Sequence, residues 1–434
     1  MLAAFRTRTH PSSVPPLALA LLLAAWATPA SADEPPMTPE RAVAIALEGN
    51  PTLAQIKARA EAMAAIPAQE GSLADPTLSF EALNLPTASG LSLRKEDMTM
   101  LEIGVSQAIP FPGKLALKEQ AAALEAEAAA HTVEEARLRL ARDVQSRWWQ
   151  LVYMHHALLI IADTEKLLKQ MIEIADTRYR VGEGLQQDTL EARLELAKLG
   201  QQRAQHAGLH RGEIARLNAL LNRPADSPIR LPEQVDTRLP EIGAPADLRA
   251  LAEHSRPLLA QRQKALAAAN SRVELAEKEV YPDFTLGAGY AFRQDTPSGQ
   301  SRSDFANFRL AMNLPIYAGS KQARMVDQRN SELLKERYAL EETQRKIESE
   351  LAAALAAYQG NREQFGLFEN GILPLAQRNV VAALNAYQVG KTDFLAVVRA
   401  ENAWFDSRMQ YWLALAEARQ ALARLMAVVG DEAP

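Results

Sequence analysis

The histidines are the first side chains in this sequence whose spacing could support chemistry. His206 and His210 are four residues apart, which places both imidazoles on one face of a helix and would allow them to bind one metal ion. No third ligand follows nearby in the sequence, so surface histidines are the favoured interpretation and we predict no metal site. His155 and His156 are adjacent and therefore point apart on a helix, which favours packing roles.

Motifs for catalysis are missing from the sequence. It contains no glycine-rich phosphate loop, no Gly-x-Ser-x-Gly and no His-Glu-x-x-His. The aromatic pair Trp148-Trp149 and the cluster at 404–412 could form a ligand platform, but such residues more often fill helix interfaces. The sequence therefore argues against an enzyme and predicts no cofactor.

The composition indicates a globular or membrane-associated protein. Of the 434 residues, 48% are hydrophobic, and 48 basic and 53 acidic side chains are interspersed to give a net charge of −5. Binding to phosphate backbones requires a basic face, which this pattern does not provide, so nucleic acid is not an expected partner. Cysteine is absent, so we expect neither a disulfide nor a lipid anchor on an N-terminal cysteine.

The first 32 residues have the pattern of a secretory signal. Arg6 and Arg8 precede an apolar run at 17–27, and small residues at 30–32 form a cleavage site. We expect the mature chain to begin at Asp33. No later apolar run reaches the roughly 20 residues that a membrane-spanning helix needs, so a location in a membrane would require strands.

The rest of the chain reads as two copies of one unit. Tyr-Arg-Val-Gly at 179–182 recurs as Tyr-Gln-Val-Gly at 387–390, an offset of 208 residues, and 50–55 matches 256–261 at an offset of 206. Chance matches would not keep such a register over most of the chain. Within a mature unit at 33–434, we predict repeat one at about 37–232, a proline-rich connector at about 223–244 and repeat two at about 245–434.

Each copy has the same order of periodicities after an opening helix. Apolar and polar side chains alternate at 76–84 and 100–109 in repeat one, and at 283–292 and 307–314 in repeat two. This pattern indicates strands that are half in water or half in lipid. Long helical runs then lead to the recurring Val-Gly stretch, which we predict to be the turn of a helical hairpin. The runs are 114–179, which would reach roughly 100 Å if continuous, and 321–387, where Gly371 and Pro374 predict a kink.

Strands of about ten residues with alternating faces are typical of transmembrane barrels. Four strands cannot close a barrel, because single-chain barrels start at about eight strands and lipid tolerates no open edge. If these strands meet lipid, several subunits must contribute to one barrel. A small periplasmic sheet that supports a coiled coil is the alternative.

This organisation, the turn "SQAIPFPGKLALKEQ" at 106–120 and the paired Tyr-x-Val-Gly tips together resemble the TolC family of outer-membrane efflux ducts. The resemblance covers nearly all of the mature chain. It implies a mostly α fold with transmembrane β strands, in which four strands per subunit pool into a trimeric 12-stranded β-barrel continued by a long periplasmic α-helical barrel. It also implies a location in the outer membrane of a Gram-negative bacterium, and two partners, an inner-membrane efflux pump and a periplasmic adaptor.

We therefore predict the outer-membrane channel of a tripartite efflux system, a passive exit duct for cargo that the pump delivers. The "IPFPGK" turn at 109–114 is similar to the heavy-metal branch of the family, so metal cations are the predicted cargo. A duct for drugs or other organic compounds is the first alternative. A periplasmic adaptor or a coiled-coil scaffold is the alternative of another class.

The resemblance also implies roles at the hairpin tips. The residue matching Tyr387 ties one tip helix against its neighbour, and a carboxylate matching Asp188 accepts a hydrogen bond from it. Val181-Gly182 and Val389-Gly390 match the adaptor-docking tips, where a residue without a side chain allows another hairpin to approach closely.

Two features depart from the family pattern. Thr392 occupies the position of a gate arginine, and Ala396 and Arg399 replace a pair of acidic residues. At the offset of 208, Asp188 aligns with Ala396 and Glu191 aligns with Arg399. We hypothesise that Arg399 bridges Asp188 or Glu191 of a neighbouring helix in the closed state. A solvated surface charge is the alternative, because exposed ion pairs contribute at most about 1 kcal/mol.

Overall fold

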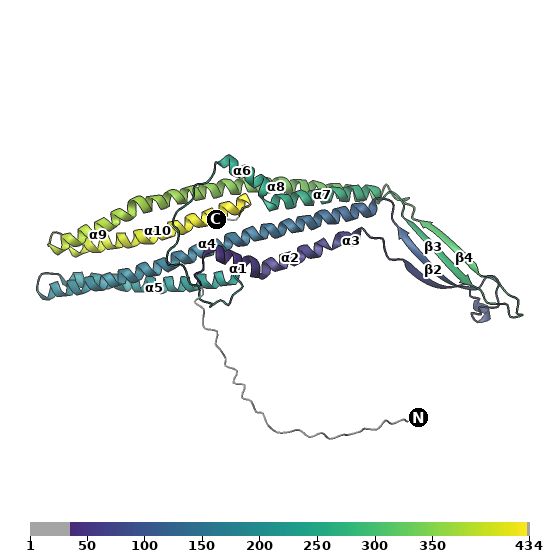
Figure 1. Cartoon of the computed structure of the whole chain (residues 1–434), viewed down its shortest axis with the longest axis horizontal. Helices are drawn as coiled ribbons and strands as arrows, with labels where there is room; N and C mark the ends of the chain where they lie inside the picture. Colours follow the sequence, from purple (N-terminus) through teal and green to yellow (C-terminus); the bar gives the residue numbers. More distant parts are fainter. Residues whose placement is uncertain (1–34, 432–434) are drawn as a thin grey trace, which may run out of the picture.

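The computed structural model describes residues 35–431, so the predicted signal at 1–32 lies outside the described residues. Figure 1 shows an elongated molecule with the strands at one end, two helical hairpin tips at the other, and shorter helices packed between the middle and the strand end. Strand and hairpin ends are therefore separated by the full length of the long helices.

Four strands form one antiparallel sheet in the order β1-β2-β3-β4. β2 pairs with β3, with Gly104 opposite Gly289, so the two repeats join at the centre of the sheet. β1 and β4 are the outer strands. The four predicted strand segments are confirmed to within two residues at each end, as β1 (Thr77–Leu83), β2 (Met100–Ile109), β3 (Phe284–Phe292) and β4 (Phe305–Met312).

One face of the sheet is apolar and uncovered. The strand register places Leu78, Val105, Ala288 and Phe308 in one row across all four strands. In this chain the side chain of Phe308 is 87% exposed, which is unusual for so large an apolar group. The predicted apolar face is therefore confirmed, and it lacks any covering layer from the described part of the chain.

The opposite face of the sheet carries polar and small residues. The amide of Asn307 donates to the carboxylate of Glu102 at 2.8 Å. Gly289 leaves room for that carboxylate, because a Cβ atom at this position would collide with Glu102. The sheet thus has one face suited to lipid and one face suited to water.

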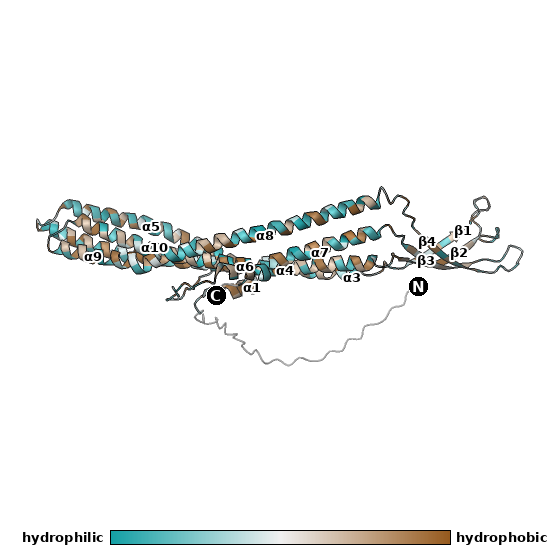
Figure 2. Cartoon of the chain, turned by 90° about the horizontal axis from the view of Figure 1, so that it is seen from above, coloured by the Kyte–Doolittle hydropathy of each residue, from teal (hydrophilic) through white to brown (hydrophobic). Residues whose placement is uncertain are grey.

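The first long helical run is continuous. α4 (Lys114–Arg180) has 67 residues, and it turns back at Val181-Gly182 into α5 (Gln186–Leu220). At 1.5 Å per residue α4 extends about 100 Å, as predicted. Figure 2 shows hydrophobic and hydrophilic residues mixed along the long helices. Among the described residues, no helix combines the length and the apolar character that crossing a membrane requires.

The second long run is interrupted where the sequence predicts a kink. α8 (Gln322–Leu367) passes through a π-helical turn (Phe368–Ile372) into α9 (Leu373–Gln388), and α10 (Phe394–Val429) follows the second tip. Pro374 lies in the first turn of α9 and has no N–H to donate to the preceding turn. The π-helical turn accommodates the missing hydrogen bond.

Shorter helices pack against the long helices from the middle of the molecule toward the sheet, and each repeat has the same joint in the middle. Asn50 caps α2, and its amide donates to the carbonyl of Leu220 at 2.9 Å. In repeat two the equivalent residue, Arg256, donates to the carbonyl of Ala427 at 2.8 Å and forms a buried ion pair with Glu135 at 2.9 Å. These helices are α1 (Pro39–Gly49), α2 (Pro51–Ala64), α3 (Ile66–Glu70), α6 (Pro245–Ser255) and α7 (Pro257–Lys278).

The Ile-Pro-Phe-Pro-Gly-Lys turn joins the sheet to the helices. Lys114 is 2% exposed, and its ammonium donates to Glu279 at 3.2 Å, to Asp283 at 2.9 Å and to the carbonyl of Tyr281 at 3.0 Å. The ring of Phe111 stacks on that of Tyr281, with the centroids 4.5 Å apart. The β2–α4 turn of repeat one is therefore fastened to the segment between α7 and β3 in repeat two.

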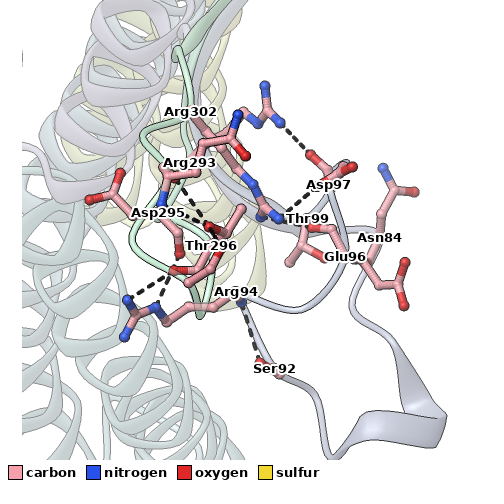
Figure 3. Close-up of polar contacts among 12 residues, drawn as sticks. Asn84, Ser92, Arg94, Glu96, Asp97, Thr99, Arg293, Asp295, Thr296 and Arg302 are labelled. Atoms are coloured by element: carbon pink, nitrogen blue, oxygen red, sulfur yellow. Dashed lines mark hydrogen bonds and ion pairs between the residues drawn. The ribbon is translucent and has the colours of Figure 1, made fainter.

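At the far end of the sheet, the loops of the two repeats are held together by arginines (Figure 3). Arg302 of the β3–β4 loop donates to the carboxylate of Asp97 at 2.7 Å and to the carbonyl of Glu96 at 3.0 Å. In the opposite direction, Arg94 of the β1–β2 loop donates to the carbonyl of Asp295 at 3.1 Å. We call this set of contacts the loop clasp; a short 3-10 turn (Thr87–Ser89) lies in the same β1–β2 loop.

Candidate functional site

Both Val-Gly stretches lie at hairpin turns, as predicted. Gly182 has φ = 80° and Gly390 has φ = 69°, backbone conformations that side chains rarely permit, and no atom would contact a Cβ at either position. Val181 and Val389 are 65% and 67% exposed. Each tip therefore presents an apolar side chain beside an open backbone surface.

Tyr387 lies in the packed interior of the second tip, with 9% of its surface exposed. Its ring lies edge-on to that of Phe394, with the centroids 5.7 Å apart. The guanidinium of Arg178 on α4 lies over the Tyr387 ring, 4.7 Å from its centroid, and donates to the Tyr387 carbonyl at 3.2 Å. These contacts tie the end of α9 to the end of α4.

The electrostatic surroundings keep the Tyr387 hydroxyl protonated. Burial raises the pKa of this hydroxyl above its usual value, the positive charge of Arg178 opposes the rise, and the negative charge of Asp188 adds to it. Asp188 is thus close enough to influence Tyr387. Within residues 35–431, however, no hydrogen bond joins the two side chains, so the implied bond is not formed inside one chain.

The remaining predicted tip residues do not converge within the chain. Arg399 is exposed on α10, and the described residues offer its guanidinium no ion pair or hydrogen bond. Thr392 and Glu191 are half-buried, and their side chains have no hydrogen-bonded partner in this part of the structure. The hypothesised bridge from Arg399 to Asp188 or Glu191 is therefore not an intrachain contact here.

Sequence reasoning missed Arg178. This residue directly precedes Tyr179, but at the offset of 208 it aligns with Ala386, so the repeat gives no hint of a paired role. Its position on the last turn of a long helix, next to the predicted hairpin, was the available signal. Together the tip helices enclose a cavity of about 290 Å³, lined by Met171, Ile174, Arg178, Glu183, Leu384, Tyr387, Gln388, Phe394 and Val397.

The carboxyl group of Glu401 is buried on α10, about three helical turns from the second tip. Glu401 is 3% exposed, and one of its carboxylate oxygens has no hydrogen-bond partner. Burial raises the pKa of Glu401 to about 7, against the lowering effect of the positive charge of Arg408. This group changes charge near neutral pH within the helix packing.

The fold of the chain and its two hairpin tips identify the class of protein. Solved structures of outer-membrane channels superpose on nearly the whole chain. VceC from Vibrio cholerae has a TM-score of 0.76 at 19% identity, covering 91% of this chain and 97% of VceC. CusC also has a TM-score of 0.76 at 19% identity, covering 91% of this chain and 92% of CusC. The chain thus has the fold of a TolC-like outer-membrane channel.

The chain belongs to the outer membrane efflux protein family, whose model matches residues 42–223 and again 248–431. This confirms the resemblance to the TolC family and the location in the outer membrane. Relatives include BepC of Brucella suis biovar 1, 27% identical over 61% of this chain and 59% of BepC. CzcC of Cupriavidus metallidurans, a cobalt-zinc-cadmium resistance protein, is 22% identical over 74% of this chain and 75% of CzcC. CusC of Escherichia coli (strain K12), a cation efflux system protein, is 28% identical over 48% of this chain and 46% of CusC.

Proposed function

We propose that three copies of this chain pool their sheets into one 12-stranded barrel in the outer membrane, continued by a helical barrel in the periplasm. The open edges and the apolar face of the sheet support this proposal. Its outer strands β1 and β4 each leave one edge unpaired, and one of its faces is apolar and exposed. Lipid tolerates no open edge, so β4 of one copy pairs with β1 of the next until the barrel closes. The polar face, with Glu102 and Asn307, then lines the lumen.

The assembly is the passive exit duct of a tripartite efflux system. An adaptor hairpin docks at the tips, because Val181 and Val389 offer exposed apolar side chains next to glycines that allow close backbone approach. An inner-membrane pump supplies the energy. In this proposal the signal at 1–32 directs export, and repeats at about 37–232 and 245–434 flank the connector at about 223–244.

Metal cations are the proposed cargo. The names of CzcC and CusC refer to cations, and the "IPFPGK" turn of this chain resembles the heavy-metal branch of the family in sequence. Drugs or other organic compounds remain the second candidate. A strain that lacks the gene should become sensitive to divalent metals, and sensitivity to drugs alone would refute the metal proposal.

The closed state uses charges at the tips. Arg399 is exposed and unpaired within the described chain, so it is available to Asp188 or Glu191 of a neighbouring subunit. Thr392 cannot supply a charge at the gate. If Arg399→Ala leaves both single-channel conductance and antibiotic leakage unchanged, this intersubunit lock does not exist.

Membrane fractionation and gel electrophoresis test the duct directly. An outer-membrane band that migrates near three times the monomer mass until it is boiled supports the shared barrel. Deletion of the strand pairs should abolish membrane insertion. A soluble, folded protein after that deletion would instead support the coiled-coil scaffold, and a soluble monomer of the intact chain would support the adaptor or the scaffold.

A further inference from the structure

Four of the seven histidines in the sequence gather at one level of the first hairpin. His155 and His156 lie on α4, and His206 and His210 lie on α5. The ring centroids of His155 and His210 are 6.2 Å apart, although the residues are far apart in the sequence. Hairpin packing therefore brings His155 of α4 next to His210 of α5, which their positions in the sequence do not reveal.

The neighbouring histidines have different surroundings. His156 stacks on Trp412 of α10, with the ring centroids 3.4 Å apart and the planes within 5°. This confirms the predicted packing role for His156 and removes it as a ligand for α5. His155, one residue earlier, is tilted by 38° against His210. All four rings are half-buried.

The distance between His155 and His210 suits one shared metal ion. A histidine nitrogen binds zinc at about 2.0–2.1 Å, which places the ring centroid about 3.2 Å from the ion. Two imidazoles on one ion therefore have centroids up to about 6.4 Å apart, or about 5.2 Å apart at a tetrahedral angle. The observed 6.2 Å lies within this range, and a tetrahedral arrangement needs a closure of about 1 Å.

His206 lies one helical turn before His210, on the same face of α5. Its Nδ1 atom is buried and has no hydrogen-bond partner. Its ring lies edge-on to that of Tyr153, with the centroids 6.5 Å apart. Residues 35–431 contain no preassembled group of three or more metal-ligating side chains, so His206 is adjacent to the histidine pair rather than part of a complete site.

We propose that His155 and His210 bind one transition-metal cation that links α4 to α5, with water completing the coordination and His206 as an auxiliary ligand. Imidazole ligands suit Zn²⁺, Co²⁺, Ni²⁺ and Cu²⁺, and they do not suit Mg²⁺ or Ca²⁺. The site is separate from the duct function, because it requires only the hairpin and holds whether the cargo is a metal or an organic compound. Its bound ion cross-links the two arms of the first hairpin.

Isothermal titration of Zn²⁺ into the full-length, chelator-treated protein in detergent tests the site. We expect one Zn²⁺ per chain for the wild type. His155→Gln and His210→Gln should each weaken binding about tenfold or more, with a smaller loss for His206→Gln. His131→Gln, on the same helix α4 but outside the cluster, is the matched control and should bind as the wild type does.

A second readout avoids dependence on heat signals. Co²⁺ bound by nitrogen ligands has visible absorption, and this absorption should appear in the wild type and in His131→Gln but not in His155→Gln. The proposal is overturned if the wild type binds no Zn²⁺ or if the His155 and His210 variants bind it with wild-type affinity. Neither result depends on trimer formation or on the export of cargo. Failure of the metal-site proposal is therefore distinguishable from failure of the proposed duct.

Discussion

Replacing Arg178 with alanine should release the second hairpin tip from α4. Two contacts are lost: the donation to the Tyr387 carbonyl at 3.2 Å and the guanidinium position 4.7 Å over the Tyr387 ring. A hydrogen bond from a charged group contributes about 1.5–3 kcal/mol, and an exposed cation–π contact contributes about 0.5–1 kcal/mol. The lower ends of these ranges sum to about 2 kcal/mol. Because the tip is half in solvent and the hydrogen bond is long, we discount this sum to about 1–2 kcal/mol.

This free energy converts to a frequency of opening. At 1.4 kcal/mol per factor of ten, the released state becomes roughly 5- to 30-fold more populated if the contact belongs only to the closed tip. Single-channel recording in planar bilayers measures this as more frequent high-conductance openings. Growth on large antibiotics that the closed duct excludes gives an independent readout of leakage.

Arg180→Ala is the matched control for this experiment. Arg180 lies on the same final turn of α4 and pairs with Asp176 at 2.5 Å. Within the described residues it makes no hydrogen bond or cation–π contact with Tyr387. Opening frequencies of Arg178→Ala that stay within twofold of both Arg180→Ala and the wild type would refute the tether. In a Tyr387→Leu background, the effect of Arg178→Ala should shrink because the ring contact is already absent.

Three further predictions concern the joint, the buried acid and the loops. Lys114→Met should lower the unfolding free energy by about 2–3 kcal/mol. Breaking a fully buried ion pair costs about 3–5 kcal/mol, and the loss is smaller here because the acidic partners of Lys114 are partly exposed. Thermal melting of this variant, with Lys118→Met as the control, measures the loss. Because the folded pKa of Glu401 is raised to about 7, the proton on Glu401 stabilises the fold at low pH, and stability falls as pH rises from about 4.5 to 7. Glu401→Gln should therefore raise stability at pH 8 by on the order of 3 kcal/mol but leave it unchanged at pH 4.5 in thermal melts. Arg302→Ala should open the loop clasp and expose residues near Asp97 to added protease, whereas a cleavage rate equal to that of the wild type would contradict this role.

The periodic and repeated features of the fold could be predicted from the sequence. Alternation over about ten residues identifies each strand, because side chains on successive residues point to opposite faces. The recurring Val-Gly pair identifies both tips, because only glycine readily adopts the backbone angles found at Gly182 and Gly390. The kink was also predictable, since Pro374 lacks the N–H that the helix requires.

Sequence patterns could not predict the contacts between helices that are distant in the sequence. The tether from Arg178 to Tyr387 depends on how closely the end of α4 approaches the end of α9. The repeat does not reveal it, because the residue of repeat two that aligns with Arg178 is an alanine. The proximity of His155 and His210 depends on the register of the α4–α5 hairpin, which the sequence spacing of two helical runs does not determine. The repeat also suggests that Tyr179 and Tyr387 are equivalent, yet Tyr179 is 45% exposed and Tyr387 is 9% exposed.

From this difference between the repeats we predict that the second tip moves. α4 is continuous down to the first tip, whereas the second hairpin has a π-helical turn at 368–372 above α9. α9 has 16 residues and is therefore a lever of about 24 Å, so a change of about 10° at the π-helical turn displaces its end by about 4 Å. A displacement of this size would break the 3.2 Å hydrogen bond that Arg178 makes at the end of α9. In this prediction the π-helical turn is the joint of the second repeat and Arg178 is its breakable tether, while α4 of the first repeat is the fixed partner. The Arg178→Ala recordings test this division directly.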